Sequence, residues 1–218
     1  GCSAVSDVVD LTITLSPTLV ASAQNTILCV GLITDLNAAA SGGTPIPPTI
    51  ITSGPFDDVS GPTNIPDNDC GTGVTIPISV SGVIDPLVGT TTVTVCVNID
   101  HNSVKNMKLV LCAPLGSPCI TLLPTQTGQA TPSGNNLFNV CFTDGFPDIN
   151  GSSPTGSFSP YGSVNMSDLN GAQTNGTWTL TVYDCKNGGG QGQADDWSIT
   201  FNTPVSTDEY TYLWSHSS

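Results

Sequence analysis

The sequence predicts an all-β fold, and three observations lead to this prediction. Apolar and polar side chains alternate in several short segments, which is the period of a β-strand with one buried face. The chain holds 23 Gly and 17 Pro in 218 residues, a composition typical of many short strands joined by tight turns. It shows no heptad pattern, so long helices are not expected. This length can bury a substantial core as one β-domain, with or without an N-terminal extension.

The strongest pair of predicted strands lies at residues 178–182 and 197–201. In each, large apolar side chains including a tryptophan occupy every second position, which predicts that the aromatics of both strands share one core face. Burial in that core is a better interpretation of the tryptophans than a carbohydrate-binding platform. The glycine-rich connection carries Asp184, Asp195 and Asp196. We expect these carboxylates to lie outside the core face, at one end of the sheet, where a hard cation could bind.

Other segments are expected to be strands on the same grounds. In the one at residues 136–144, Phe138, Val140 and Phe142 are in phase and are predicted to face the core. Residues 38–62 are rich in Pro and small side chains without a period, which predicts a linker or an extended crossing segment. The remaining expected strands are residues 8–15, 26–33, 74–80, 91–99 and 208–215.

The charge of the chain excludes some partners. Against 17 acidic residues there are 3 Lys and Arg, which gives a formal net charge of −14. Such a field repels phosphate backbones and anionic lipid surfaces, so we expect no nucleic acid partner. The longest apolar run, residues 27–33, is too short to span a bilayer, so no membrane insertion is expected. The acidity itself fits either simple solubility or a calcium-binding β-module.

Eight cysteines without Cys-x-x-Cys pairs favour disulfides in an oxidising compartment over a zinc site. Cys112 and Cys119 flank a Pro/Gly turn, and we expect a disulfide across that hairpin. Cys96 and Cys141 are out of phase with the core residues of their strands, which predicts a bridge on the outer face. A Cys2–Cys29 bridge would fasten the N-terminal strands. Full pairing is expected, with the partners of Cys70 and Cys185 not assigned. These observations predict a secreted chain whose signal peptide has been removed.

Three motifs carry a family resemblance. They are Gly-Thr-Trp-Thr-Leu-Thr-Val-x-Asp at 176–184 followed by Asp-Trp-Ser-Ile-Thr-Phe at 196–201, the His-containing run 100–117 with its Ala-Pro-Leu-Gly turn, and Ile-Pro-Asp-Asn at 65–68. Residues 64–202 thereby resemble the P domain (P/Homo B domain) that follows the catalytic domain in kexin- and furin-like proteases. The resemblance implies a jelly-roll-type β-sandwich, preceded by additional N-terminal strands and a crossing segment at residues 1–63 and followed by a strand-like tail at residues 203–218.

The resemblance also implies calcium binding. Calcium takes six to eight oxygen ligands, and loops with Asp and Gly at the ends of a sheet supply them. In one place the sequence departs from the family run, because Lys105-Asn106-Met107 replaces Gly-Asp-Leu and one charge is lost. The alternative is that these side chains only form turns. The candidate ligands are Asp100, Asn106, Asp144, Asp148, Asp184, Asp195 and Asp196.

Catalysis by this chain alone is not expected. A serine protease needs an aspartate, a histidine and an activated serine, but the chain has two histidines, His101 and His216, and no nucleophile motif. His101 is expected to be a hydrogen-bonded residue at the end of a strand.

Two functional hypotheses remain. The first is a non-catalytic extracellular or bacterial surface module, structural or adhesive, such as a subunit of a surface filament or repeat array, stabilised by calcium and disulfides. The tail at residues 208–215 resembles the opening strand of PKD-like and Ig-like adhesin repeats, and the terminal strands favour self-association or contact with neighbouring domains. The second is a protease-associated P domain that stabilises a subtilisin-like serine endopeptidase domain lying outside this chain. The first is favoured because residues 1–63 do not resemble the end of a subtilisin domain.

Overall fold

The computed structural model describes a chain that divides into two compact units. One comprises Gly1–Thr49 with Ser206–Ser218, and the other comprises Ile50–Val205. Each is considered by itself. The strands predicted at residues 8–15, 26–33 and 208–215 lie outside the described residues. The described residues are 18–23, 36–41, 48–125, 134–149, 154–187 and 192–205.

The described part of the first unit is a two-stranded antiparallel sheet. It pairs β1 (Thr18–Ala23) with β2 (Leu36–Ser41), and Thr18 lies opposite Ser41. Neither strand coincides with the segments expected at residues 8–15 and 26–33, so those two predictions are not tested here.

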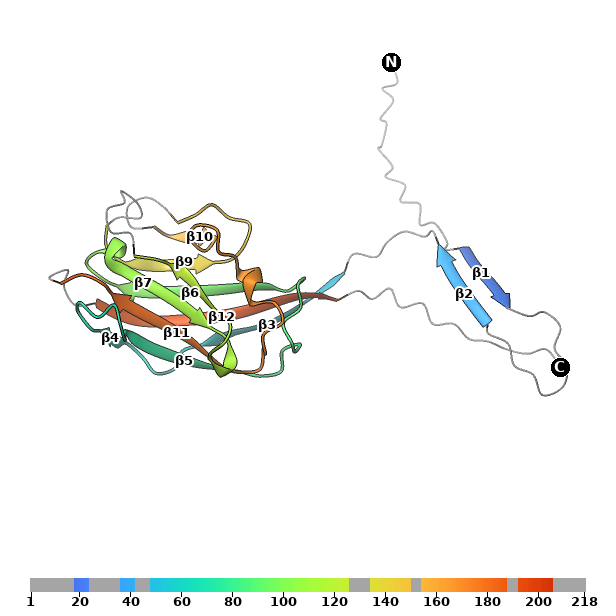
Figure 1. Ribbon diagram of the computed structural model, residues 1–218, viewed down its shortest axis with the longest axis horizontal. Coiled ribbons are helices and arrows are strands. Elements are labelled where there is room, and N and C mark those ends of the chain that lie inside the picture. Colours follow the sequence, from blue (N-terminus) through green and yellow to red (C-terminus); the bar gives the residue numbers. More distant parts are fainter. Residues whose placement is uncertain are drawn as a thin grey trace, which may run out of the picture. The chain divides into compact units, whose positions relative to one another are not determined.

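The second unit is a β-sandwich of two sheets (Figure 1). The larger sheet has the order β10-β9-β6-β12-β3, with β4 also paired to β12, and the smaller has the order β5-β11-β7-β8. Three short 3-10 turns, η1, η2 and η3, join strands, and the described ranges contain no α-helix. No helical segment within the described residues is long and apolar enough to cross a membrane. The bounds are β3 Thr49–Asp57, β4 Thr63–Ile65, β5 Val74–Val80, β6 Thr92–Asp100, β7 Met107–Cys112, β8 Cys119–Leu123, β9 Leu137–Phe142, β10 Gly156–Phe158, β11 Gly176–Asp184, β12 Gly192–Val205, η1 Val104–Asn106, η2 Pro114–Gly116 and η3 Met166–Leu169.

The core lies between the sheets, as the alternating patterns predicted. Trp178 of β11 and Trp197 of β12 are both buried, and the rings of Trp178 and Phe201 lie 5.6 Å apart. The indole nitrogen of Trp178 donates a hydrogen bond to the carbonyl of Thr174 at 2.7 Å, which satisfies its polar atom. The two strands face each other from opposite sheets, because β11 pairs with β5 and β7 whereas β12 pairs with β6 and β4.

Strand β3 belongs to the stretch that was expected to be a linker or an extended crossing segment. It is extended, and it forms the edge of the larger sheet beside β12. Most of its side chains are exposed, so it shows little of the alternation by which a half-buried strand is identified.

The prediction for Phe138 is wrong because β9 contains a bulge. Ile99 pairs with Leu137 and Val97 pairs with Val140, so two residues of β9 stand opposite one residue of β6. Asn139, inside the bulge, has a φ of 53°. The extra residue changes the phase of the strand. Leu137 is therefore buried in place of Phe138, whose side chain is 42% exposed.

Two predicted disulfides are confirmed. Cys112–Cys119 closes the β7–β8 hairpin, and Cys96–Cys141 joins β6 to β9. A third bridge, Cys70–Cys185, joins the loop before β5 to the residue after β11. The Cys2–Cys29 prediction lies outside the described residues.

Candidate functional site

One end of the sandwich gathers most of the predicted site residues, and we call it the histidine end. Here β6 ends at Asp100, β11 ends at Asp184, and β12 begins at Gly192. The register places Gln193 opposite Asp100, and His101 follows directly after β6. The histidine end therefore combines segments from both sheets.

His101 and Asp184 form a buried pair. The distance from His101 Nε2 to Asp184 Oδ2 is 3.3 Å, and both side chains are fully buried. His101 Nδ1 lies 3.0 Å from both the backbone nitrogen and the carbonyl oxygen of Ser103, so it accepts from the N–H in one tautomer and donates to the carbonyl in the other. The other carboxylate oxygen of Asp184 accepts a hydrogen bond from the N–H of Lys186 at 3.1 Å. The pair thus connects the larger sheet to the smaller one.

The expectation that Asp184 lies outside the core face is wrong. Asp184 occupies the position after Val182 in the alternation of β11, so its side chain points inward with the core residues. A carboxylate can be buried there because His101 compensates its lost hydration. The alternation of this strand was a signal that could have identified the burial of Asp184.

The backbone around His101 is also fixed. Its N–H donates to Asn136 Oδ1 at 2.8 Å, and its carbonyl accepts from the N–H of Asn136 at 2.9 Å. A Cβ atom on Gly192 would overlap the His101 ring, so only glycine lets β12 begin so close to it. His101 is therefore the hydrogen-bonded histidine at a strand end that was expected. Its ring is enclosed and occupied, which is unsuitable for a general base acting on an external substrate.

Asn106 and the Cys70–Cys185 disulfide lie beside this pair. The carbonyl of Asn106 accepts a hydrogen bond from the N–H of Cys185 at 2.8 Å. Asn106 is buried, and it ends the short turn η1 that leads into β7. The chain after β11 is thus held by a covalent bond on one side and a backbone hydrogen bond on the other.

Three further carboxylates, Asp100, Asp195 and Asp196, lie on the larger sheet at the histidine end. Desolvation raises the pKa of Asp195 above its usual value, and repulsion from Asp100 and Asp196 raises it further. Asp196 accepts a hydrogen bond from the amide of Asn98 at 2.8 Å. These carboxylates carry negative charge that the surroundings compensate only in part.

The other two candidate ligands lie towards the opposite end. Strand β9 runs antiparallel to β6 and ends at Phe142 opposite Val95, so the chain that follows it leads away from Asp100. Asp144 accepts hydrogen bonds from the backbone N–H groups of Met166 and Ser167 at 2.7 and 3.0 Å. Asp148 accepts one from Gly162 at 3.3 Å. Both act as turn-stabilising carboxylates here.

The seven candidate ligands thus occupy several places instead of one. Across the described ranges, no group of three or more His, Cys, Asp or Glu side chains is arranged to hold a metal ion. The assignment of metal ligands therefore stays a prediction.

Comparisons with known proteins follow from this architecture. A family model described as "Proprotein convertase P-domain" matches residues 90–201, just over half of the chain. A search of the curated proteins finds no match.

Two solved structures from Aeromonas sobria are similar in part. One is a serine protease, with a TM-score of 0.46 and 16% identity, covering 72% of this chain and 27% of that one. The other is a serine protease in complex with its chaperone, with a TM-score of 0.45 and 15% identity, covering 73% of this chain and 28% of that one. This chain spans less than a third of their length.

Proposed function

The chain belongs to the proprotein convertase P-domain family, and from this premise we propose that it stabilises a subtilisin-like serine endopeptidase domain as its non-catalytic companion. The matched residues 90–201 coincide with the strands from β6 to β12 that form most of the sandwich. P domains are non-catalytic modules of proteases. The proposal replaces the structural or adhesive module as the first choice, because the match concerns the sandwich itself and not the terminal strands.

The observation that supports the non-catalytic role is the burial of the His101 ring and the contacts of its two nitrogens. His101 is the one histidine among the described residues, its ring is buried, and Asp184 and Ser103 contact its two nitrogens. A triad base needs an exposed nitrogen beside a serine. The enclosed state of His101 thus supports the proposal that the sandwich is the non-catalytic companion of a partner domain.

The test is to read the gene on both sides of these residues and to express its product with and without residues 50–205. We expect a subtilisin-like domain with an Asp-His-Ser triad, whose thermal inactivation becomes faster when the sandwich is removed. Purified sandwich should hydrolyse no peptide substrate. A gene without such a domain, or a protease whose half-life is unaffected, would contradict the proposal.

A second candidate function is a structural or adhesive subunit outside the cell. It is favoured by the chain outside the family match, since residues 1–49 and 206–218 form a unit separate from the sandwich and two of its segments pair as β1 and β2. Three disulfides suit an oxidising, extracellular location. Sedimentation at high concentration distinguishes the two functions, because a filament subunit associates through its ends and a protease-bound domain stays monomeric.

Calcium remains part of the proposal in a narrower form. We assign it to Asp100, Asp195 and Asp196, since Asp184 already has His101 as its partner. Desolvation and then repulsion from Asp100 and Asp196 raise the pKa of Asp195, and a divalent cation bound there would relieve the repulsion. The three carboxylates do not converge in their described positions, so an ion would have to draw them together.

A further inference from the structure

A small hollow lies on the larger sheet, where β9 begins. Its volume is about 250 Å³, below the range of roughly 300–1,000 Å³ usual for drug-sized ligands. Such a space suits a ligand of one ring. Its lining residues are Asn135, Asn136, Phe138, Asn139, Pro154 and Thr155.

The β-bulge creates this hollow. It turns Phe138 out of the core, and bulges commonly redirect a side chain towards a binding site. Strand β10 pairs with β9 only from Gly156, opposite Val140. Pro154, just before β10, has no backbone N–H to donate to a neighbouring strand. The two strands therefore lie side by side without pairing over this stretch, and the space between them stays open.

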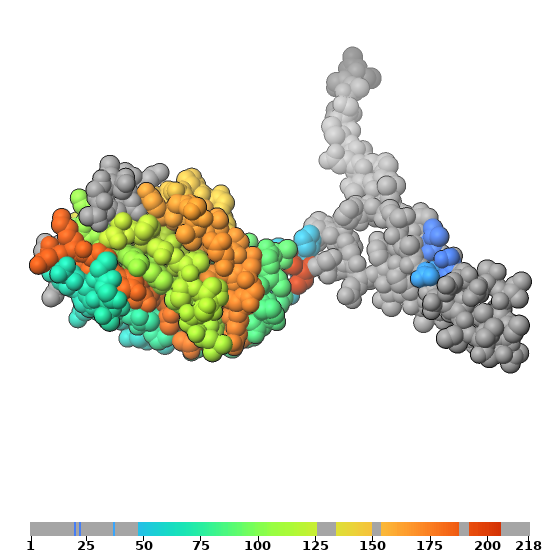
Figure 2. Space-filling model, in the orientation of Figure 1, coloured from blue at the N-terminus to red at the C-terminus, as the bar shows by residue number. Residues whose placement is uncertain are grey.

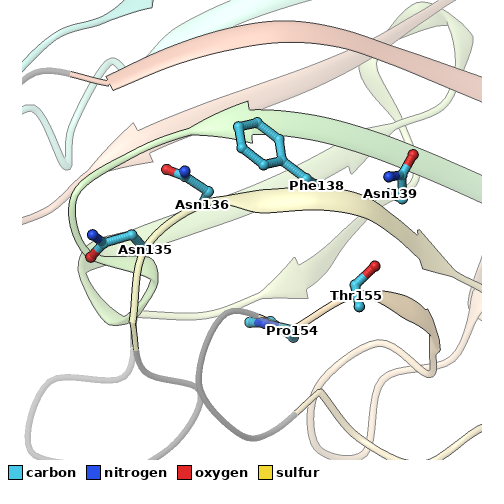
Figure 3. A pocket seen from close by; sticks show the side chains of 6 residues that line it. All are labelled: Asn135, Asn136, Phe138, Asn139, Pro154 and Thr155. Atoms are coloured by element: carbon cyan, nitrogen blue, oxygen red, sulfur yellow. The ribbon is translucent and has the colours of Figure 1, made fainter.

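Figure 3 shows how the lining side chains are arranged. Asn136 lies just before β9, and Phe138 and Asn139 lie in it, with the Phe138 ring between the two amides; Thr155 lies on the neighbouring chain. Phe138 is 42% exposed, although an aromatic ring would ordinarily be withdrawn from water. The hollow thus combines one accessible aromatic ring with several amide groups.

The side chain of Asn136 is held by a hydrogen bond, whereas Asn139 is held through its backbone alone. Asn136 accepts the His101 N–H at 2.8 Å through Oδ1, which leaves its Nδ2 donors to the hollow. Asn139 is fixed through its backbone, whose N–H donates to Asn98 Oδ1 at 2.7 Å. Within the described part of the chain, the side-chain amides of Asn135 and Asn139 make no hydrogen bond to protein. A site fixed before binding loses less conformational entropy when its ligand arrives.

We propose that this hollow binds a neutral sugar ring. The C–H face of a pyranose can stack on Phe138, and each asparagine amide can both donate to and accept from neighbouring hydroxyl groups. None of the six lining residues is charged, and the net charge of −14 disfavours acidic sugars.

A sugar also fits better than an extended peptide. Recognition of a peptide by strand addition needs a free sheet edge. Here β9 is bordered by β6 on one side, and β10 pairs with it on the other side from Val140 onwards, so the unpaired edge at the hollow is too short for an added strand. Trp178 and Trp197 play no part in this site, since both are buried in the core.

The test is a titration of the full chain, followed by the amide resonances of its asparagine side chains in NMR. The probes are galactose, N-acetylglucosamine, maltose and cellobiose, with an uncharged acetyl-triproline amide as the peptide alternative. We expect at least one sugar to shift the resonances of Asn135, Asn136 and Asn139 with a dissociation constant on the order of 1 mM, as suits a single-ring ligand.

Variants assign the binding to the hollow. Phe138→Ala should weaken it about tenfold, whereas Phe138→Tyr should preserve it. Asn139→Gly keeps the left-handed backbone of the bulge and should weaken binding through the lost amide. Phe146→Ala is the matched control, because Phe146 is an equally exposed phenylalanine, at 49%, outside the hollow, and its removal should change nothing.

Three results would overturn the proposal. They are the absence of shifts with all four sugars, equal sugar affinity in Phe138→Ala and the wild type, and shifts with the proline peptide alone. The last would identify the hollow as a peptide site. Retained Cys96–Cys141 bonding and an unchanged melting temperature would show that each variant is folded.

Discussion

The two ends of the sandwich are closed by different kinds of contact. At the end formed by the β7–β8 hairpin, the Cys112–Cys119 disulfide joins residues 7 positions apart, and the N–H of Ala113 donates to the nearby carbonyl of Pro118 at 3.0 Å. At the histidine end, the Cys70–Cys185 disulfide joins residues 115 positions apart. The His101–Asp184 pair there connects the two sheets.

From this difference we infer that the histidine end contributes more to the stability of the sandwich than the hairpin end. A local cross-link restricts the unfolded chain only slightly, whereas a link between distant residues removes much of its freedom. The histidine end also buries the Asp184 carboxylate beside His101, and removing one member of such a buried pair is costly. We therefore expect changes at the histidine end to lower the stability of the whole sandwich and equivalent changes at the hairpin end to have smaller effects.

The largest expected effect is the loss of the Cys70–Cys185 bridge. The double variant Cys70→Ser/Cys185→Ser should lose up to about 5 kcal/mol of unfolding free energy, since the loop it closes is long. Cys112→Ser/Cys119→Ser is the matched control and should lose only about 2 kcal/mol. Denaturant titration of both variants measures the difference. Equal losses would show that loop length does not govern the contribution of these bridges.

The second largest effect is expected from Asp184→Ala, which removes the buried carboxylate that lies 3.3 Å from His101 Nε2. The cost should be about 3 kcal/mol. Asp184→Asn should cost less, because it keeps a polar group of the same size beside His101. The control is Asp148→Ala, since Asp148 is exposed. Thermal melts of the three variants give the order, and an Asp184→Ala protein as stable as Asp148→Ala would show that the pair contributes nothing.

The third expected effect concerns Gly192. Gly192→Ala should destabilise the sandwich by about 1–3 kcal/mol, because the added Cβ meets the His101 ring and the carbonyl of Asp100. Gly89→Ala is the control, since the nearest atom to a Cβ there is the amide nitrogen of Asn170 at 3.6 Å, an ordinary contact. Equal melting temperatures for the two variants would mean that β12 can shift away from the ring at no cost.

The hairpin end could be predicted from sequence because its contacts are local. Cys112 and Cys119 flank a visible turn, and the alternation in residues 178–182 and 197–201 directly determines which side chains enter the core. By contrast, β4 and β10 have three residues each, which is too short to show a period.

The histidine end could not be predicted in the same way. The pairing of His101 with Asp184 depends on how the two sheets face each other, which no local pattern contains. The hollow beside Phe138 was missed for a related reason, because a single extra residue at Asn139 reverses the phase on which the burial prediction depended. The paired asparagines Asn135 and Asn136 before the strand were the available hint of an irregular backbone.

The smallest expected effect distinguishes Asp195 from Asp184, two carboxylates of the histidine end that the sequence analysis treated alike. Asp184 has a partner, whereas Asp195 has its pKa raised by desolvation and by Asp100 and Asp196. Because its pKa in the folded state lies above the usual value of 3.8, its contribution to stability is full below pH 3.8 and is lost as the pH rises through the folded-state pKa. Asp195→Asn should therefore increase the free energy of unfolding at pH 7 by less than about 1 kcal/mol, given solvent screening. The melting temperature should rise accordingly, and this gain should disappear below about pH 4.

Calcium should reverse the order of stability of the wild type and the Asp195→Asn variant. An ion bound to Asp100, Asp195 and Asp196 stabilises the wild type by about 2.7 kcal/mol at a hundredfold excess over its dissociation constant, whereas Asp195→Asn loses one ligand charge and most of that response. Asp148→Asn, altered at an exposed carboxylate outside this group, should respond like the wild type. The measurement is a melting curve in chelator and in calcium for all three proteins. If Asp195→Asn is the more stable protein at pH 7 under both conditions, the crowded carboxylates carry only repulsion, and the calcium assignment at the histidine end is wrong.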